Sequence, residues 1–118
     1  MQVELVSPER ILYSGEAEMV IARSEGGDIA FLSGHAPFVG TLGVAKLRIQ
    51  EAGGNEVAFA VHGGFVEVKD NRVTVLSDVA EQASQIDVAR ARASLEAASS
   101  AGDEAAKRRA EVRLEVAG

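Results

Sequence analysis

Short apolar runs rich in β-branched residues alternate with glycine-containing turns over the first two thirds of the chain. This pattern is typical of the strands of a small sandwich or flattened barrel. Segments 52–55 and 69–72 combine Gly, Asn or Asp with polar neighbours, so the strands on either side of each should pair antiparallel. The pattern predicts strands at residues 3–6, 19–22, 29–32, 44–49, 57–61, 65–68 and 73–76.

The pattern changes after Asp78, where alanine, arginine and glutamate dominate, aromatic residues are absent and apolar positions recur at helical spacing. Ser84 with Asp87 can cap a first helix, residues 99–102 should end it, and Asp103 can cap a second helix of about 14 residues. The short break between the helices predicts an antiparallel hairpin.

One apolar face is expected on each helix. On the first helix it comprises Ile86, Ala89, Ala93 and Ala97, widened by Val88, Ala91, Leu95 and Ala98. On the second helix it comprises Ala106, Ala110, Leu114 and Ala117. Because alanine buries little area, at roughly 25 cal/mol per Å² the hairpin should be only marginally stable by itself.

The predicted fold is therefore mainly β plus α. An N-terminal antiparallel β-sandwich over residues 1–83 is followed by a C-terminal antiparallel two-helix hairpin over residues 84–118. With 118 residues the chain can bury a modest core.

Composition excludes several classes of site. The chain has no cysteine, which rules out disulfides and thiolate chemistry, and its two histidines make a histidine-built metal site improbable. No apolar run is long enough for a membrane helix, and residues 1–4 do not resemble a signal peptide, so we expect a soluble protein. The net charge is −6, with 12 acids and 6 bases in residues 1–83, which disfavours nucleic-acid binding.

Three motifs in a fixed order carry a resemblance to a known family. They are Gly-Asp-Ile-Ala-Phe-Leu-Ser-Gly-His-Ala-Pro at 27–37, Gly-Gly-Phe-Val-Glu-Val at 63–68 and Asn-Arg-Val-Thr-Val-Leu at 71–76, followed by the two-helix tail. With this layout the chain resembles the epsilon subunit of bacterial F-type ATP synthases over essentially its whole length. Any one of the motifs alone would be weak evidence.

The resemblance implies a rotor subunit at the foot of the central stalk, bound to the gamma subunit and to the membrane c-ring. Such a subunit has no active site and needs no cofactor. It couples proton-driven rotation of the c-ring to ATP synthesis, H⁺ being the commoner coupling ion in the family. Its hairpin can restrain ATP hydrolysis through transient contact with the alpha and beta subunits. The location implied is peripheral, at the cytoplasmic face of the bacterial plasma membrane.

The first motif implies residues for contact with the c-ring. Asp28 and His35 fall at the family's contact positions, with Glu25 beside them, and a carboxylate and an imidazole can form charge-assisted hydrogen bonds with polar loops. Without the resemblance, His35 would be read as a loop histidine that satisfies a turn. Ala30 and Ser33 depart from the family's usual glycine and proline, and Ser33 should leave the loop more mobile. The other histidine, His62, is expected to be structural or solvent-facing.

The tail matches the family's Ile/Leu-Asp-x-x-Arg-Ala motif, which is associated with ATP binding by the folded hairpin. A glutamate before the motif and two arginines four residues apart on the second helix complete the family's site. The matching residues are Glu81, Ile86, Asp87, Arg90, Ala91, Arg109 and Arg113. The arginines could surround a triphosphate, but no Walker-type glycine loop is present, so bound ATP would be a regulatory ligand.

Other interpretations of these residues stay open. Asp87 and Arg90 could be no more than a helix cap and an ion pair three residues apart, and the arginines of the second helix a solvated face. The alternative function is a free nucleotide-binding regulatory module, whereas a small β-sandwich enzyme lacks any carboxylate pair at catalytic spacing. A coupling subunit needs partner surface, which we expect at residues 39–42 and 65–68, covered by gamma.

Overall fold

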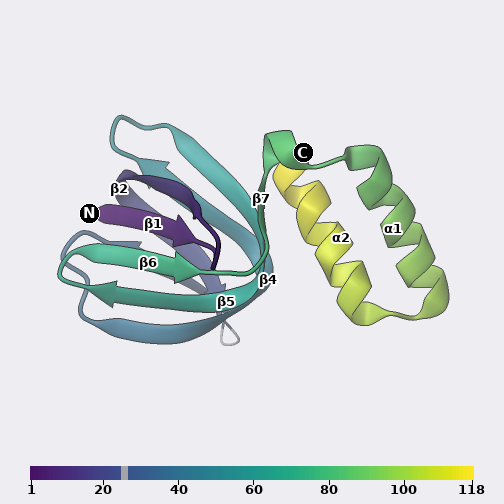
Figure 1. Ribbon diagram of the computed structural model, residues 1–118, viewed down its shortest axis with the longest axis horizontal. Helices are drawn as coiled ribbons and strands as arrows, with labels where there is room; N and C mark the ends of the chain where they lie inside the picture. Colours follow the sequence, from purple (N-terminus) through teal and green to yellow (C-terminus); the bar gives the residue numbers. More distant parts are fainter. Residues whose placement is uncertain (25–26) are drawn as a thin grey trace.

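The computed structural model describes residues 1–24 and 27–118 and measures 45 × 27 × 26 Å. A domain built from strands at one end is followed by two helices at the other (Figure 1). The strands are β1 Gln2–Val6, β2 Ile11–Ser24, β3 Gly27–Leu32, β4 Phe38–Glu51, β5 Glu56–Lys69, β6 Arg72–Leu76 and β7 Ala80–Gln82. The helices are the 3₁₀ turn η1 Ala83–Gln85, α1 Val88–Ala101 and α2 Glu104–Ala117. Neither α-helix has the length and apolarity that crossing a bilayer requires.

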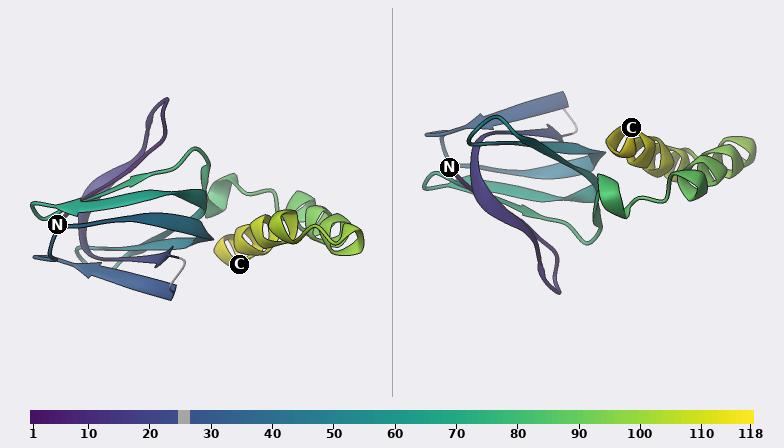
Figure 2. Two further views of the ribbon diagram at one scale, coloured as in Figure 1. Left: turned by 90° about the horizontal axis from the view of Figure 1, so that it is seen from below. Right: turned by 90° about the horizontal axis from the view of Figure 1, so that it is seen from above.

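The strands form a curved sheet that closes on itself. Their order is β1-β6-β5-β4-β2-β3, and β1 also pairs with β2, so five strands make a flattened ring (Figure 2); β3 pairs with β2 and β7 with β5. The predicted β-sandwich with antiparallel hairpins is confirmed, apart from the parallel pairing of β1 with β6. Phe31, Leu47 and Ile49 are among the fully buried side chains that fill its interior.

Strand β5 runs without a break through the two glycines that we expected to separate two strands. Gly63 and Gly64 have φ of 85° and 149°, which glycine adopts most readily, and a Cβ on Gly64 would clash with the backbone carbonyl of Leu76. The predicted strands at 57–61 and 65–68 are therefore one strand that bends. The hairpin turn at 69–72 is confirmed, because Asp70 and Asn71 both have positive φ.

The hairpin begins and ends close to the predicted positions. The Asp87 carboxylate accepts a hydrogen bond from the Arg90 backbone N–H, and Asp103 caps α2 in the same way. Ser84 does not cap α1, since it lies within η1. Residues 99–101 do not end the helix either; it ends only at Gly102, which adopts the left-handed conformation (φ 71°).

The apolar face predicted for α1 is confirmed for the residues that widen it and wrong for the three alanines at its centre. Ala89, Ala93 and Ala97 are exposed, whereas Ala91 and Ala98 are buried. Alanine occurs on every side of this helix, so the sequence pattern did not distinguish the buried face from its neighbours.

Helix α2 connects the hairpin to the β-domain. Val112 and Val116 are buried in a cluster with Ala60 of β5 and Ile86, and α2 contacts β4, β5 and β7. Helix α1 lies on the side of α2 away from the strands (Figure 1). The apolar part of the interface that holds the hairpin in place is therefore small.

Candidate functional site

A cleft of ≈ 270 Å³ lies where β7, η1 and the two helices meet. It brings together five of the seven residues predicted for a nucleotide site. The cleft is lined by Glu81, Gln85, Asp87, Arg90, Ala91, Ser94 and Arg113. The sequence-predicted residues thus converge from β7, the start of α1 and the second half of α2.

The other two predicted residues lie outside the cleft lining. Ile86 is buried in the apolar cluster beneath α2, where it supports the segment that leads into α1. Arg109 lies one helical turn before Arg113, and its charge acts on His62.

Glu81 makes the closest polar contacts of the site. Its Oε1 accepts hydrogen bonds from Arg113 Nε at 2.7 Å and from His62 Nε2 at 2.9 Å. Burial acts to raise the pKa of Glu81, but the hydrogen bonds from Arg113 and His62 outweigh it and lower that pKa. Glu81 is therefore a carboxylate that joins β5, β7 and α2.

Sequence reasoning missed His62. Its side chain is only 5% exposed, so it is not solvent-facing, and its Nδ1 is buried with no hydrogen-bond partner among the described residues. It follows Ala58 and Ala60 at alternate positions of β5, so all three lie on the face that α2 covers. This alternation was the signal in the sequence that could have predicted the burial of His62. It could be interpreted only once the position of α2 on β5 was known.

The cleft contains both signs of charge. The Arg90 guanidinium makes no hydrogen bond or ion pair with any described residue, whereas Arg113 is paired with Glu81. A free guanidinium is a good partner for phosphate oxygens, but the two carboxylates of Glu81 and Asp87 oppose a highly charged anion. The volume lies just below the ≈ 300–1,000 Å³ typical of ligand pockets, so a nucleotide would be only partly enclosed.

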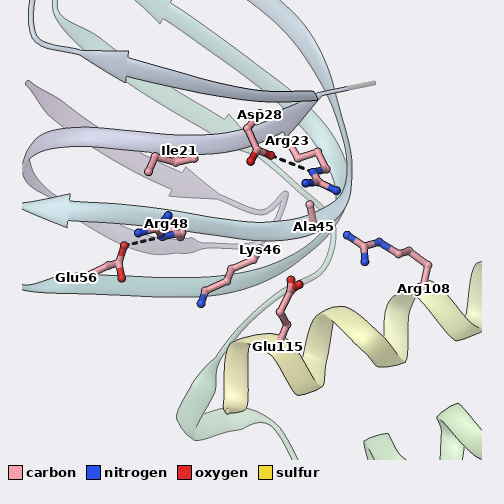
Figure 3. A pocket seen from close by; sticks show the side chains of 9 residues that line it. All are labelled: Ile21, Arg23, Asp28, Ala45, Lys46, Arg48, Glu56, Arg108 and Glu115. Atoms are coloured by element: carbon pink, nitrogen blue, oxygen red, sulfur yellow. Dashed lines mark hydrogen bonds and ion pairs between the residues drawn. The ribbon is translucent and has the colours of Figure 1, made fainter. Parts of the chain in front are cut away.

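A second cleft of ≈ 360 Å³ separates the β-domain from the other side of α2 (Figure 3). Most of its charges are already paired, with Arg23 bound to Asp28 at 3.0 Å and Arg48 to Glu56 at 2.7 Å. Arg108 donates from Nε to the Val44 carbonyl. This cleft is larger but less suited to an anion. Among the described residues, no group of three or more His, Asp or Glu could hold a metal ion.

Comparison with known proteins identifies the family. The family model for the ATP synthase delta/epsilon chain β-sandwich domain matches residues 1–83. The ATP synthase epsilon chain of Streptomyces avermitilis is 45% identical over 114 residues, which cover 97% of this chain and 92% of that protein. The chain belongs to the ATP synthase epsilon chain family. Epsilon chains are non-catalytic subunits, and this chain is not an enzyme.

Solved structures share the fold of this epsilon chain. A chain of the Euglena gracilis mitochondrial ATP synthase matches with a TM-score of 0.74 and 24% identity, over 97% of this chain and 74% of that one. A chain of the Tetrahymena thermophila mitochondrial ATP synthase, in a structure of its central stalk and c-ring, matches with a TM-score of 0.66 and 16% identity. It covers 100% of this chain and 96% of that one.

The residues predicted to contact the c-ring are not brought together in this epsilon chain. Asp28 lies near the start of β3, in the second cleft, and His35 lies beyond the other end of that strand. Glu25 lies outside the described residues. His35 packs against Phe31, with ring centroids 5.1 Å apart.

The turn between β5 and β6 fixes the loop that carries His35. The Asn71 Oδ1 accepts hydrogen bonds from the Gly34 N–H at 2.9 Å and the Ser33 hydroxyl at 3.2 Å. Ser33, which stands where the family usually has proline, thus gains a side-chain contact that proline could not make.

The outer face of the epsilon chain's β-domain carries an exposed apolar row. Phe65 (56% exposed) pairs across the strands with Leu76, and Val39 lies nearby on β4. Ile11, at the end of the β1–β2 pair, continues the row. Only alternate residues of the predicted segments 39–42 and 65–68 belong to it, because Leu42, Val66 and Val68 face the core.

Proposed function

We propose that this epsilon chain is a rotor subunit of the ATP synthase central stalk that couples proton-driven rotation of the c-ring to ATP synthesis. Its 83-residue β-domain serves as the docking part and residues 84–118 as the regulatory part. The subunit acts at the cytoplasmic face of the plasma membrane through its complex. No observation favours the alternative of a free nucleotide-binding module.

The exposed apolar row carries the proposal of a docking role. Phe65, Leu76, Val39 and Ile11 are each at least 46% exposed, although they are large apolar side chains in a small domain. An apolar patch of this kind marks a partner surface. The gamma subunit is the partner that the resemblance implies, and burial of Phe65 at its centre would make that residue an anchor.

Co-purification with the gamma subunit tests this surface. Phe65→Asp should abolish capture of gamma, because binding would bury an unpaired carboxylate. Leu32→Asp is the matched control, since Leu32 is 55% exposed but lies on β3 outside the row. Equal capture by both variants, or loss with both, would refute the assignment of the row to gamma.

We propose that Asp28, His35 and Glu25 contact the c-ring; Asp28 lies near the start of β3 and His35 beyond its other end. Because the chain has no cysteine, single cysteines at positions 28 and 35 give clean cross-linking probes in the assembled complex. Cross-links from only one position would identify which end of β3 faces the c-ring. Absence of cross-links from both would reject this part of the proposal.

We propose in addition that the cleft beside α1 binds ATP as a regulatory ligand. The support is the convergence of Glu81, Asp87, Arg90, Ala91 and Arg113 on one cleft, together with the unpaired guanidinium of Arg90. The described residues that line the cleft include no glycine-rich phosphate loop, so we expect ATP to be bound and not hydrolysed.

Isothermal titration with ATP tests the nucleotide site. Arg90→Ala should abolish saturable binding, and Arg92→Ala is the matched control because Arg92 is an exposed arginine of the same helix outside the cleft lining. Arg90 is the better target than Arg113, whose removal would also release Glu81. If the wild-type protein shows no heat at about 1 mM ATP, the affinity is too weak for sensing and Asp87 with Arg90 is a capped helix start only.

A further inference from the structure

We propose that His62, Glu81 and Arg113 form a pH-sensitive latch that holds the helical hairpin on the β-domain. The latch is closed while the His62 ring is neutral, and it opens when the ring takes up a second proton. The proposal does not depend on ATP binding. It gives His62, which the nucleotide site does not use, a role in hairpin docking.

The first support is connectivity. His62 lies on β5, Glu81 on β7 and Arg113 on α2, and Glu81 Oε1 accepts from both neighbours at 2.9 Å and 2.7 Å. Only one of the three residues belongs to the hairpin. Undocking of α2 therefore removes Arg113 from Glu81 but leaves His62 and Glu81 together.

The second support is the tautomer that this geometry requires. Since the Glu81 carboxylate is an acceptor, His62 Nε2 must carry the hydrogen, and in the neutral ring Nδ1 is a bare acceptor. Nδ1 is buried and has no hydrogen-bond partner among the described residues. A second proton would therefore create a buried N–H donor with no acceptor, at a cost that disappears when the ring reaches water.

The third support is the charge around the ring. Burial lowers the pKa of His62, and the charges of Arg113 and Arg109 lower it further, against the opposing effect of Glu81. Both arginines leave with α2, and so does the burial that α2 provides. Glu81 stays, as does Asp78, which lines a hollow together with His62, while the nearest cross-strand neighbour on β4 is the uncharged Val44.

The sign of the effect follows from these groups. The undocked state binds a proton at His62 more readily than the docked state, so the docking free energy becomes less favourable as pH falls. The contribution is fully present above the undocked pKa of His62 and is lost as pH falls to the lowered docked pKa. Within that window the ratio of docked to undocked molecules should fall by up to about tenfold per pH unit.

The small interface makes such a change effective. The apolar contact between hairpin and β-domain rests on Val112, Val116 and Ile86 packed against small residues of β4 and β5. Because so few side chains make the apolar contact, a latch that changes the ratio of docked to undocked molecules even tenfold is a substantial part of the docking free energy.

A distance measurement on the full chain tests the latch. Cysteines introduced at the exposed positions Lys69 and Ser100 carry a fluorescent donor and acceptor, one on each part, and the chain has no other cysteine. Energy transfer is followed in urea at about pH 8 and about pH 5.5, on either side of the ordinary titration of histidine. In the wild-type background, the urea midpoint for hairpin release should be lower at acid pH.

Two variants separate the latch from other effects of acid. His62→Gln keeps an N–H donor for Glu81 but cannot titrate, so its release midpoint should be the same at both pH values. His35→Gln, which removes the other histidine, should behave as wild type. The proposal is overturned if His62→Gln retains the wild-type pH dependence, or if the wild type shows none.

Discussion

Truncation of Val112 to alanine tests how the hairpin is held. Val112 is 0% exposed and packs with Ala60, Ile86 and Val116 between α2 and the β-domain. The substitution removes two methyl groups, which at about 0.8 kcal/mol each gives about 1.6 kcal/mol. Incomplete collapse of the resulting cavity raises the expected loss to about 2 kcal/mol, or roughly thirtyfold in the docking equilibrium.

Two optical signals distinguish the parts of the molecule. The chain has a single tyrosine, Tyr13 on β2, and no tryptophan, so tyrosine fluorescence reports the β-domain and helical circular dichroism reports the hairpin. In a urea titration of Val112→Ala, the helical transition should move to lower urea while the Tyr13 transition stays in place. The reason is that undocked alanine-rich helices gain little burial of their own.

Glu111→Ala is the matched control. Glu111 precedes Val112 on α2 but is exposed, and alanine is a good helix former, so the change should lie within about 0.5 kcal/mol. If Val112→Ala shifts the helical transition no more than Glu111→Ala, the buried cluster does not hold the hairpin. A shift of both optical signals by the same amount would show that the hairpin and β-domain unfold as one unit.

Three further outcomes are expected. Gly64→Ala should destabilise the β-domain by about 3 kcal/mol or more, because the added Cβ would clash with the backbone of Leu76. Gly53→Ala adds its Cβ in open space and should cost only about 1 kcal/mol, from the positive φ alone. Thermal unfolding of the two variants measures the difference. Asn71→Gly keeps the turn but removes the hydrogen bond to Gly34, so amide exchange at Gly34 should accelerate while the melting temperature changes little. Burial, followed by the hydrogen bond to Glu51 and the charge of Glu51, raises the pKa of Tyr13 to about 12. The stability of the β-domain should therefore fall as pH rises above about 10, the ordinary pKa of tyrosine. An absorbance titration that gives an ordinary pKa for Tyr13 would contradict this.

The strand pattern and turn chemistry were enough to predict the fold class. Alternation of buried and exposed residues is local information, and so is the preference of Asp70 and Asn71 for positive φ. The continuity of β5 was not predictable, since glycines mark either a break or a bend and only the packing against Leu76 decides. The parallel β1–β6 pair depends on how the ring closes, which no local pattern encodes.

The candidate site was predicted in part for the same reason. The start of α1 is a local motif, so Asp87 and Arg90 were placed correctly relative to each other. His62 was missed because its burial comes from α2, about 50 residues later in the chain. The sequence did not predict that Val112 and Val116 are buried, because the alanine pattern of α2 indicated a face toward α1. The two valines pack instead against the β-domain.

The position of β1 between β2 and β6 has a consequence for synthesis. The ribosome makes β1 well before β6, so residues 2–6 find their second neighbour only when residues 72–76 have been translated. Until then one edge of β1 is unpaired and open to pairing with other chains. The hairpin helices are translated after β6. The ring of strands can thus close only after residue 76 has been translated. A pause in translation before codon 76 would prolong the period in which the nascent chain can aggregate through the free edge of β1.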